Sequence, residues 1–209
     1  MIAGAAPAVA DVRILSLGDS YTIGEAVAAE DAWPTRLAAL LRRQGMRVAP
    51  PTVIARTGWT TDELASAIRE ANPAPSYDIV TVLVGVNDQY RGHRMEDYRD
   101  KFRTLLDTAV GFAGGRADRV IVLSIPDWGA TPFAAGRDRA DIARAIDGFN
   151  AANRAETSRA RARYVDVAAV SRRVPAEPDL VAADGLHPSG RMYAEWAGLV
   201  LPEVRAALG

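Results

Sequence analysis

The sequence contains no cysteine and only one lysine, Lys101, among its 209 residues. The lack of cysteine excludes disulfides, thiolate nucleophiles and cysteine-ligated zinc. Nearly all the positive charge comes from arginines, which are interspersed with acidic residues to a formal net charge of -1. Because the arginines form no basic block or stripe, we expect no nucleic-acid partner.

Long apolar runs are also missing from the chain. No segment approaches the roughly 18 apolar residues of a membrane-spanning helix, and the apolar start MIAGAAPAVA lacks the basic flank of a secretory signal. We therefore expect a soluble, cytoplasmic protein without membrane insertion. With 49% hydrophobic content, residues 1–209 are expected to form a single globular domain. The composition leaves the oligomeric state open.

Short β-branched runs alternate with longer segments of helical periodicity, a pattern typical of βαβ units around a parallel sheet. The runs show little polar alternation, as expected for strands covered on both faces. Those predicted as strands are Val12 to Leu17, Thr52 to Arg56, Asp78 to Val84, Arg119 to Ile125 and Arg163 to Val167. We predict an α/β fold around a five-stranded parallel sheet, for which the flavodoxin-like strand order 2-1-3-4-5 is assumed.

Apolar stripes at helical spacing lie between and after these runs and predict helices that pack on the sheet. Thr60 and Glu63 have the spacing of a capping box that opens a helix. Pro202 is expected to bend or interrupt the last helix. The three stripes are Tyr98, Phe102, Leu105, Leu106 and Ala109; Ile142, Ile146 and Phe149; and Met192, Trp196, Leu199 and Val200.

The first three predicted strands end in polar turns that contain glycine, GDS at 18–20, TGWTT at 57–61 and GVND at 85–88. In the order 2-1-3 these turns are neighbours at the carboxyl edge of the sheet, where ligands bind. Ser20, Gly58 and Asn87 should therefore converge. A hydroxyl on a strand-to-helix turn, a glycine amide and a carboxamide suit attack on a carbonyl and stabilisation of the oxyanion.

The segment DGLHPSG at 184–190 follows the fifth predicted strand and supplies an imidazole. Asp184 can reach Nδ1 of His187 and fix its tautomer, so that Nε2 faces Ser20. Pro188 restrains the backbone of His187 to an extended conformation. These features make Ser20, Asp184 and His187 a candidate catalytic triad.

Four motifs in this order resemble those of the SGNH (GDSL) hydrolase family: GDS, a glycine turn after the second strand, GxND, and DxxHP before the last helix. The resemblance implies Ser20 as nucleophile, with Asp184 and His187 completing the triad. It implies an oxyanion hole made of the backbone N–H groups of Ser20 and Gly58 and the side-chain amide of Asn87. It further implies a three-layer αβα sandwich of the SGNH-hydrolase type. The mechanism expected from these residues is that of a serine esterase with an acyl-enzyme intermediate, which needs no metal or cofactor. The family's leucine after GDS is Tyr21 here, which leaves the shape of the neighbouring pocket open.

The substrate expected from this pattern is a small soluble carboxylic ester, because a chain of this length leaves little room for a large lid. Thioesters, acetylated sugars and lysophospholipids remain alternatives within the same chemistry. Aromatic residues in or beside the carboxyl-end turns predict an apolar acyl pocket, although some could simply cover the sheet. They are Tyr21, Trp59, Tyr90, Trp128 and Phe133.

Each motif taken alone is also an ordinary turn. GDS could cap the following helix, and residues 184–190 could form an Asx-type turn before a helix capped by Ser189. Asn87 and Asp88 could be turn formers, and Gly58 could only satisfy a positive φ. The joint order of the motifs favours a functional site, because unrelated caps have no reason to occur in this arrangement.

The other ionisable residues are assigned lesser roles. His93 has no partner nearby in sequence and is predicted to be a solvated loop histidine. Asp88 and Asp166 are rival triad acids, but neither shares a loop with His187. Asp19 is interpreted as a structural partner of its own turn. The arginines from 137 to 163 alternate with acidic residues and predict a solvated helix face.

Two readings from other classes remain open. A non-catalytic, flavodoxin-like module could bind a small ligand at the same loops, although GDSYTIGE has neither the G-x-G-x-x-G spacing nor a P-loop lysine. A metal-dependent hydrolase could use Asp19, Asp184 and His187 as ligands, but one histidine and two distant aspartates are a poor zinc set.

Overall fold

Five strands form a single parallel sheet in the order β2-β1-β3-β4-β5, as predicted. The computed structural model describes residues 11–74 and 76–209, so the start MIAGAAPAVA lies outside the described residues. Every strand falls within one residue of a predicted run. The strands are β1 (Ile14–Gly18), β2 (Thr52–Ala55), β3 (Ile79–Leu83), β4 (Val120–Leu123) and β5 (Arg163–Val165).

The sheet is covered unevenly along its width. All residues of β1, β3 and β4 are buried, which explains why these runs are continuously apolar. Thr52 and Val53 of β2 are exposed, so the expectation of strands covered on both faces is wrong for this edge strand. Among the described residues β2 pairs with β1 alone, and no other strand lies along its outer side. The buried centre of the sheet therefore supports the turns that follow β1 and β3.

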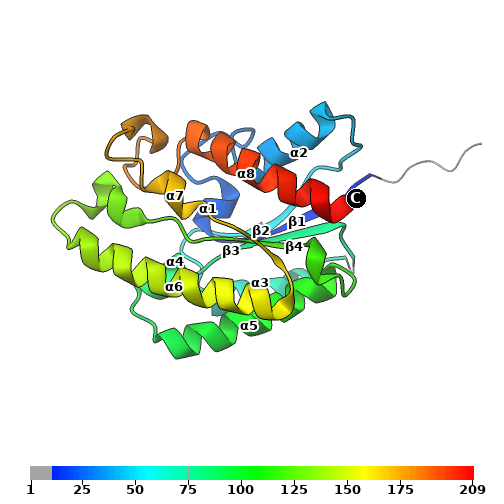
Figure 1. Cartoon of the computed structure of the whole chain (residues 1–209), viewed down its shortest axis with the longest axis horizontal. Coiled ribbons are helices and arrows are strands. Elements are labelled where there is room, and N and C mark those ends of the chain that lie inside the picture. Colours follow the sequence, from blue (N-terminus) through cyan, green and yellow to red (C-terminus); the bar gives the residue numbers. More distant parts are fainter. Residues whose placement is uncertain (1–10, 75) are drawn as a thin grey trace, which may run out of the picture.

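Helices cover both faces of the sheet and complete the three predicted layers (Figure 1). α2 and α8 pack against each other on one face, and α3, α5 and α6 lie on the other. Short helices follow the strands at the carboxyl edge. The helices are α1 (Ser20–Ile23), α2 (Trp33–Arg43), α3 (Thr61–Ala71), α4 (Val86–Tyr90), α5 (Met95–Phe112), η1 (Ala117–Arg119), η2 (Trp128–Ala130), η3 (Pro132–Ala134), α6 (Arg139–Ala160), α7 (Ala168–Ser171), η4 (Pro178–Leu180) and α8 (Gly190–Leu208).

The predicted apolar stripes of α5 and α6 are fully buried, and the capping box of α3 is formed. The Thr60 backbone N–H donates to Glu63 Oε2 at 2.8 Å, and the Thr60 hydroxyl accepts the Glu63 N–H at 3.4 Å. These interactions satisfy N–H groups that the first turn of a helix leaves free. The start of α3 is thereby fixed directly after the TGWTT turn.

The last helix differs from the prediction at Leu199, and Pro202 does not interrupt it. Leu199 is 42% exposed, because the buried face of α8 is centred on Trp196 and Val200 and Leu199 lies at its margin. Pro202 lies inside α8 without ending it. Val200 and Val204, both fully buried, hold the helix against the core on either side of Pro202.

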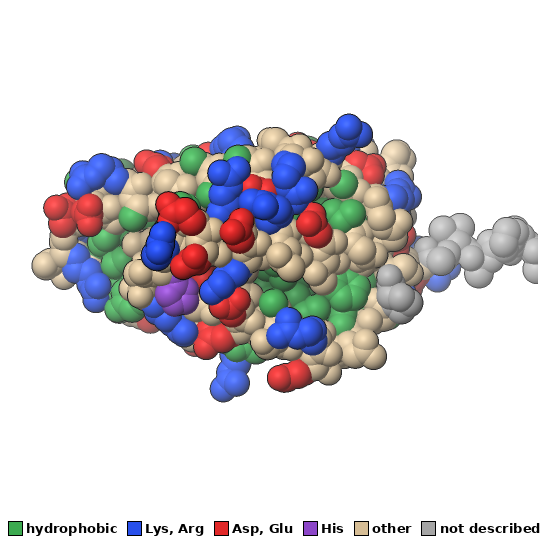
Figure 2. Space-filling view, turned by 90° about the horizontal axis from the view of Figure 1, so that it is seen from below, with side chains coloured by type: hydrophobic (Ala, Val, Ile, Leu, Met, Phe, Trp, Pro, Cys, Tyr) green, Lys and Arg blue, Asp and Glu red, His purple; other side chains and the backbone are tan. Residues whose placement is uncertain are grey.

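The outer surface over α3, α5 and α6 carries basic and acidic side chains side by side (Figure 2). Arginines of this face pair with acidic neighbours, as Arg159 does with Asp107 at 2.9 Å. Such interspersed charges give no concentrated positive field for a polyanion. Among the helices of the described residues, none has both the length and the apolar character needed to cross a bilayer.

Candidate active site

The turns after β1, β2 and β3 meet at one edge of the sheet because these strands are neighbours. Ser20, Gly58 and Asn87, one from each turn, line a single pocket of about 190 Å³. His187 lines the same pocket from the loop before α8. The convergence expected from strand order and motif position is therefore present.

The GDS turn presents Ser20 at the amino end of α1. Gly18 is required here, because a Cβ at this position would lie 2.1 Å from Thr22 Oγ1 and 2.5 Å from the Leu83 carbonyl oxygen. Asp19 caps the helix by accepting the Tyr21 N–H at 3.0 Å. Neither the backbone N–H nor the hydroxyl of Ser20 has a hydrogen-bond partner among the described residues, so both remain available to a ligand in the pocket.

Asp19 is completely buried, and its Oδ2 has no partner among the described residues. Burial raises the pKa of this carboxyl to about 8, and the nearby Asp88 carboxylate acts in the same direction. Burial therefore favours the neutral form of Asp19. Its role as a partner of its own turn is confirmed by the cap on Tyr21.

Two further N–H donors face the pocket. The Gly58 N–H has no acceptor among residues 11–74 and 76–209, and its φ of 83° is the left-handed conformation that favours glycine. The Asn87 amide donates one N–H to the Trp59 carbonyl oxygen at 2.9 Å. Because a carboxamide carries two N–H groups, the second is left for a ligand.

The DGLHPSG segment forms the expected histidine–aspartate pair. Asp184 Oδ2 lies 2.5 Å from His187 Nδ1, while Oδ1 accepts the backbone N–H groups of Leu186 and His187, each at 3.0 Å. Ser189 caps α8 by accepting the Met192 N–H. The Asx turn and the helix cap thus coexist with the pair, and the turn itself aims the carboxylate at the ring.

His187 is 8% exposed, and its ring packs edge-on against Tyr21 at 5.6 Å between centroids. Partial burial opposes ionisation of Asp184, but hydrogen bonds from the His187 ring and from the Leu186 and His187 N–H groups outweigh it and lower the pKa of this carboxyl. The carboxylate is thus ionised at neutral pH and orients Nδ1–H of the ring.

Aromatic rings form the far wall of the pocket. Tyr90, Trp128 and Phe133 line it together with Tyr21, with ring centroids 5.5 Å apart for Tyr90 and Trp128 and 6.0 Å apart for Trp128 and Phe133. The Arg137 guanidinium lies within 5.5 Å of all three of these ring centroids and donates to the Tyr90 hydroxyl at 3.2 Å. This wall is apolar on the pocket side.

One predicted pocket residue lies elsewhere. Trp59 does not line this pocket but a shallow hollow over β2, beside Val53 and Ala67, so the alternative that some aromatics simply cover the sheet holds for this residue. Thr57, Val86 and Leu186 line the pocket and were not predicted. All three lie inside the recognised motifs, but the sequence does not indicate that their side chains point into the pocket.

The second histidine also has an acidic partner. His93 is a loop residue with its side chain 36% exposed, in line with the prediction, but its Nδ1 lies 3.1 Å from Asp88 Oδ1, so the expectation that it has no partner is wrong. Asp88 also accepts the backbone N–H and the hydroxyl of Thr61 at 2.9 and 3.0 Å. Asp166 accepts from Ser124 and pairs with Arg154. Both rival acids are therefore bonded to groups other than His187.

A metal at Asp19, Asp184 and His187 finds no support in the donor arrangement. Among the described residues, no group of three or more histidine, aspartate or glutamate side chains is placed to hold a metal ion. The hydroxyl, the imidazole–carboxylate pair and the free N–H donors are instead the groups that acyl transfer uses.

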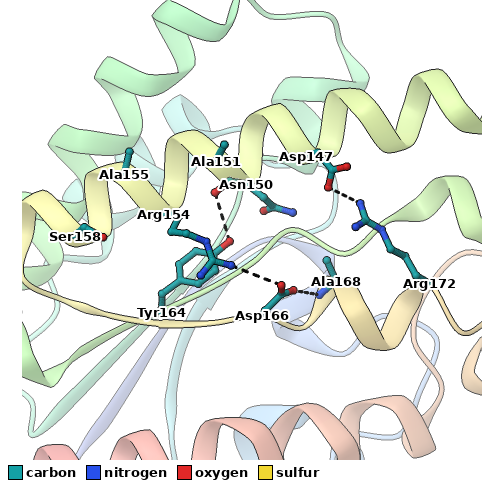
Figure 3. A pocket seen from close by; sticks show the side chains of 10 residues that line it. All are labelled: Asp147, Asn150, Ala151, Arg154, Ala155, Ser158, Tyr164, Asp166, Ala168 and Arg172. Carbon is teal, nitrogen blue, oxygen red and sulfur yellow. Dashed lines mark hydrogen bonds and ion pairs between the residues drawn. The ribbon is translucent and has the colours of Figure 1, made fainter.

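A larger hollow, about 490 Å³, lies between α6 and the β5 to α7 segment and shares no lining residue with the site (Figure 3). Its charges neutralise one another: Arg172 pairs with Asp147 at 2.6 Å, and Arg154 pairs with Asp166 at 3.6 Å. The lining contains Ser158 but no histidine. Size alone therefore does not identify the active site, whereas the convergent polar groups do.

Comparison with known proteins gives one family match. The model of the GDSL-like lipase/acylhydrolase family matches residues 16–195. No curated protein sequence matches the chain.

Solved structures of similar fold share low sequence identity with this chain. TesA is 20% identical with a TM-score of 0.70, covering 94% of this chain and 99% of its own. Axe2, an acetylxylan esterase from Geobacillus stearothermophilus, is 18% identical with a TM-score of 0.71, covering 92% and 94%. The lipase/acylhydrolase from Enterococcus faecalis is 20% identical with a TM-score of 0.70, covering 95% and 97%. At these identities the likeness supports the αβα fold.

Proposed function

The chain belongs to the GDSL-like lipase/acylhydrolase family, and on this premise we propose that it is a serine esterase that hydrolyses small carboxylic esters. Ser20 is the nucleophile, His187 the general base, and Asp184 the carboxylate that orients the imidazole. The observation that carries the proposal is the 2.5 Å contact between His187 Nδ1 and Asp184 Oδ2 beside a pocket that also contains Ser20.

The reaction proceeds in two steps. His187 Nε2 takes the Ser20 proton as Oγ bonds to the acyl carbon, and the imidazolium then protonates the leaving alcohol as the ester C–O bond breaks. Water attacks the resulting acyl-enzyme, with His187 again as base, and releases the acid and free Ser20. In both steps the Ser20 and Gly58 N–H groups and the Asn87 amide hold the oxyanion. The mechanism requires the Ser20 hydroxyl to donate to His187 Nε2 once substrate fills the pocket.

The pocket supports a short acyl group. Its volume of about 190 Å³ is below the roughly 300 to 1,000 Å³ of pockets that hold drug-sized ligands. The aromatic wall of Tyr90, Trp128 and Phe133 offers apolar contact to an acyl chain. One neighbour of similar fold is an acetylxylan esterase, and an acetylated carbohydrate is a compatible substrate class. Thioester and lysophospholipid hydrolysis remain alternatives with the same triad.

The test is hydrolysis of p-nitrophenyl acetate, butyrate, octanoate and palmitate. We expect kcat/KM to be highest for acetate or butyrate, and Ser20→Ala to lower kcat by about 10⁴-fold or more. Ser158→Ala is the matched control, because Ser158 is an exposed serine of α6 in the hollow that contains no histidine. The proposal fails if the wild-type protein cleaves none of these esters, or if Ser20→Ala retains its activity.

A further inference from the structure

Arg91 links the helix that carries Asn87 to the loop that carries Gly58. Its Nη2 donates to the Gly58 carbonyl oxygen at 2.5 Å, and its Nη1 donates to Glu63 Oε2 at 3.2 Å. Arg91 follows Asn87 by four residues, and its backbone N–H donates to the Asn87 carbonyl oxygen at 3.0 Å. One short helix and the residue that caps its carboxyl end therefore carry both an amide of the site and a cation bound to the facing loop.

The Gly58 loop, residues 56–60, has few internal hydrogen bonds to fix its orientation. The only backbone-to-backbone hydrogen bond donated within residues 56–60 runs from the Trp59 N–H to the Arg56 carbonyl oxygen at 3.3 Å, and the Thr60 N–H donates to the Glu63 side chain. Gly58 has no side chain and a φ of 83°, so its peptide planes rotate easily. A rotation that leaves the fold intact still changes where the Gly58 N–H points. The carbonyl of Gly58 belongs to the peptide after its Cα, and the N–H belongs to the peptide before it. The Arg91 bond therefore fixes the 58–59 peptide and the Gly58 Cα, which leaves the N–H fewer directions in which to point.

Other contacts hold the loop in place when this bond is absent. Asn87 donates to the Trp59 carbonyl oxygen at 2.9 Å, and Asp88 accepts the Thr61 N–H at 2.9 Å. The Arg91 and Glu63 side chains are each 45% exposed, and exposed ion pairs contribute little to stability. Removal of the Arg91 side chain should therefore loosen the orientation of Gly58 without unfolding α3 or α4.

We propose that Arg91 is a positioning residue that aims the Gly58 N–H at the substrate oxyanion through its bond to the Gly58 carbonyl. The inference rests on the proposed esterase function, because it concerns the donors of the oxyanion hole. Arg91 touches no reacting atom. Its contribution belongs to the transition state, in which the carbonyl oxygen gains charge, and hardly to the binding of the neutral ester.

The test compares Arg91→Ala, Arg91→Gln and Arg91→Lys with the wild-type enzyme on the best short-chain ester. Because a small misplacement of a catalytic group costs up to about 100-fold, we expect kcat of Arg91→Ala to fall about 10-fold to 100-fold with KM changed less than about threefold. Arg91→Gln, which keeps much of the side chain, should behave similarly. Arg91→Lys should recover part of the rate, since an ammonium donates to the Gly58 carbonyl but lacks the fork that also reaches Glu63.

Two measurements separate positioning from a structural role. The melting temperature of each variant should match that of the wild type. A trifluoromethyl ketone, whose adduct places an oxyanion in the hole, should bind Arg91→Ala more weakly by the same factor as the loss in kcat/KM. The matched control is Arg94→Ala, which removes an exposed arginine that pairs with Glu96 at 3.8 Å, and it should leave kcat and KM unchanged.

Four results would overturn the inference. If the wild type is active and the kcat of Arg91→Ala lies within twofold of the wild-type value, the inference about Arg91 fails while the proposed function stands. If kcat falls while the affinity for the ketone is unchanged, Arg91 does not position the oxyanion hole. If kcat falls together with the melting temperature, Arg91 has a structural role instead. A wild type without ester hydrolysis overturns the proposed function, and the inference with it.

Discussion

Each of the two histidines lies beside an aspartate at its Nδ1, but the two pairs differ in which partner is buried. In the pair of His187 and Asp184 the atoms are 2.5 Å apart, and the ring is the better buried partner, with side chains 10% and 34% exposed. In the pair of His93 and Asp88 the distance is 3.1 Å, and the carboxylate is buried, with side chains 36% and 1% exposed.

This difference separates the pair that we propose as catalytic from a structural one. Asp184 is anchored by its own turn and directs a buried ring into a pocket that contains a hydroxyl. Asp88 directs its carboxylate at the start of α3, where it accepts two hydrogen bonds from Thr61, and His93 covers it from outside. A histidine beside an aspartate is therefore no active site by itself. Its role depends on which groups lie next to the other ring nitrogen, Nε2.

The largest expected contrast is kinetic. His187→Ala should lower kcat by about 10⁴-fold or more, because no other group in the pocket can take the Ser20 proton. His93→Ala should leave kcat within about threefold, since His93 does not line the pocket. Steady-state hydrolysis of a short-chain ester measures both. Comparable losses in the two variants would abolish the distinction between the pairs.

The second contrast concerns the free energy of unfolding, for which we expect the pair of Asp88 to matter more than the pair of Asp184. Asp88→Ala leaves the Thr61 N–H and hydroxyl without an acceptor, and Thr61 is 1% exposed, so the free energy of unfolding should fall by about 1–3 kcal/mol. Asp184→Ala should cost less stability, because its partners lie in a partly exposed loop, while costing more activity. Urea unfolding followed by circular dichroism gives both free energies. A less stable Asp184→Ala than Asp88→Ala would contradict this assignment.

The smallest expected contrast is the dependence of stability on acidic pH. The pKa of Asp184 is lowered below its ordinary 3.8, so its stabilising contribution is complete above pH 3.8 and is lost as the pH falls through the folded-state pKa. Asp184→Asn should therefore be less stable than the wild type at pH 6, and the difference should shrink below pH 3.8. Urea midpoints between pH 6 and pH 3 measure this. A difference that stays constant or widens in acid would show that ionised Asp184 does not stabilise the fold.

The fold was predictable because its signals are local and repeated. β-branched runs, apolar stripes such as that of α5, and the capping box of Thr60 and Glu63 each specify one element, and burial in the structure agrees with them. Strand order followed from the type of sheet, and it brings Ser20, Gly58 and Asn87 to one pocket. The pairing of Asp184 with His187 followed from their shared loop.

What escaped the sequence depends on the direction of side chains. Trp59 lies in the right turn but covers β2, and Leu199 has the right spacing but lies at the margin of its face. His93 reaches Asp88 only because the chain turns after α4, and Arg91 reaches Gly58 across 33 positions of sequence. No periodicity encodes contacts between two loops that only the folded sheet brings together.

The most direct test of the central claim is active-site labelling of the folded protein with a fluorophosphonate, followed by intact mass measurement and peptide mapping. The account predicts one adduct per chain on Ser20, lost in His187→Ala and retained in His93→Ala. The absence of an adduct on folded protein, or labelling that does not depend on His187, would contradict an assembled triad and would favour a ligand-binding module instead.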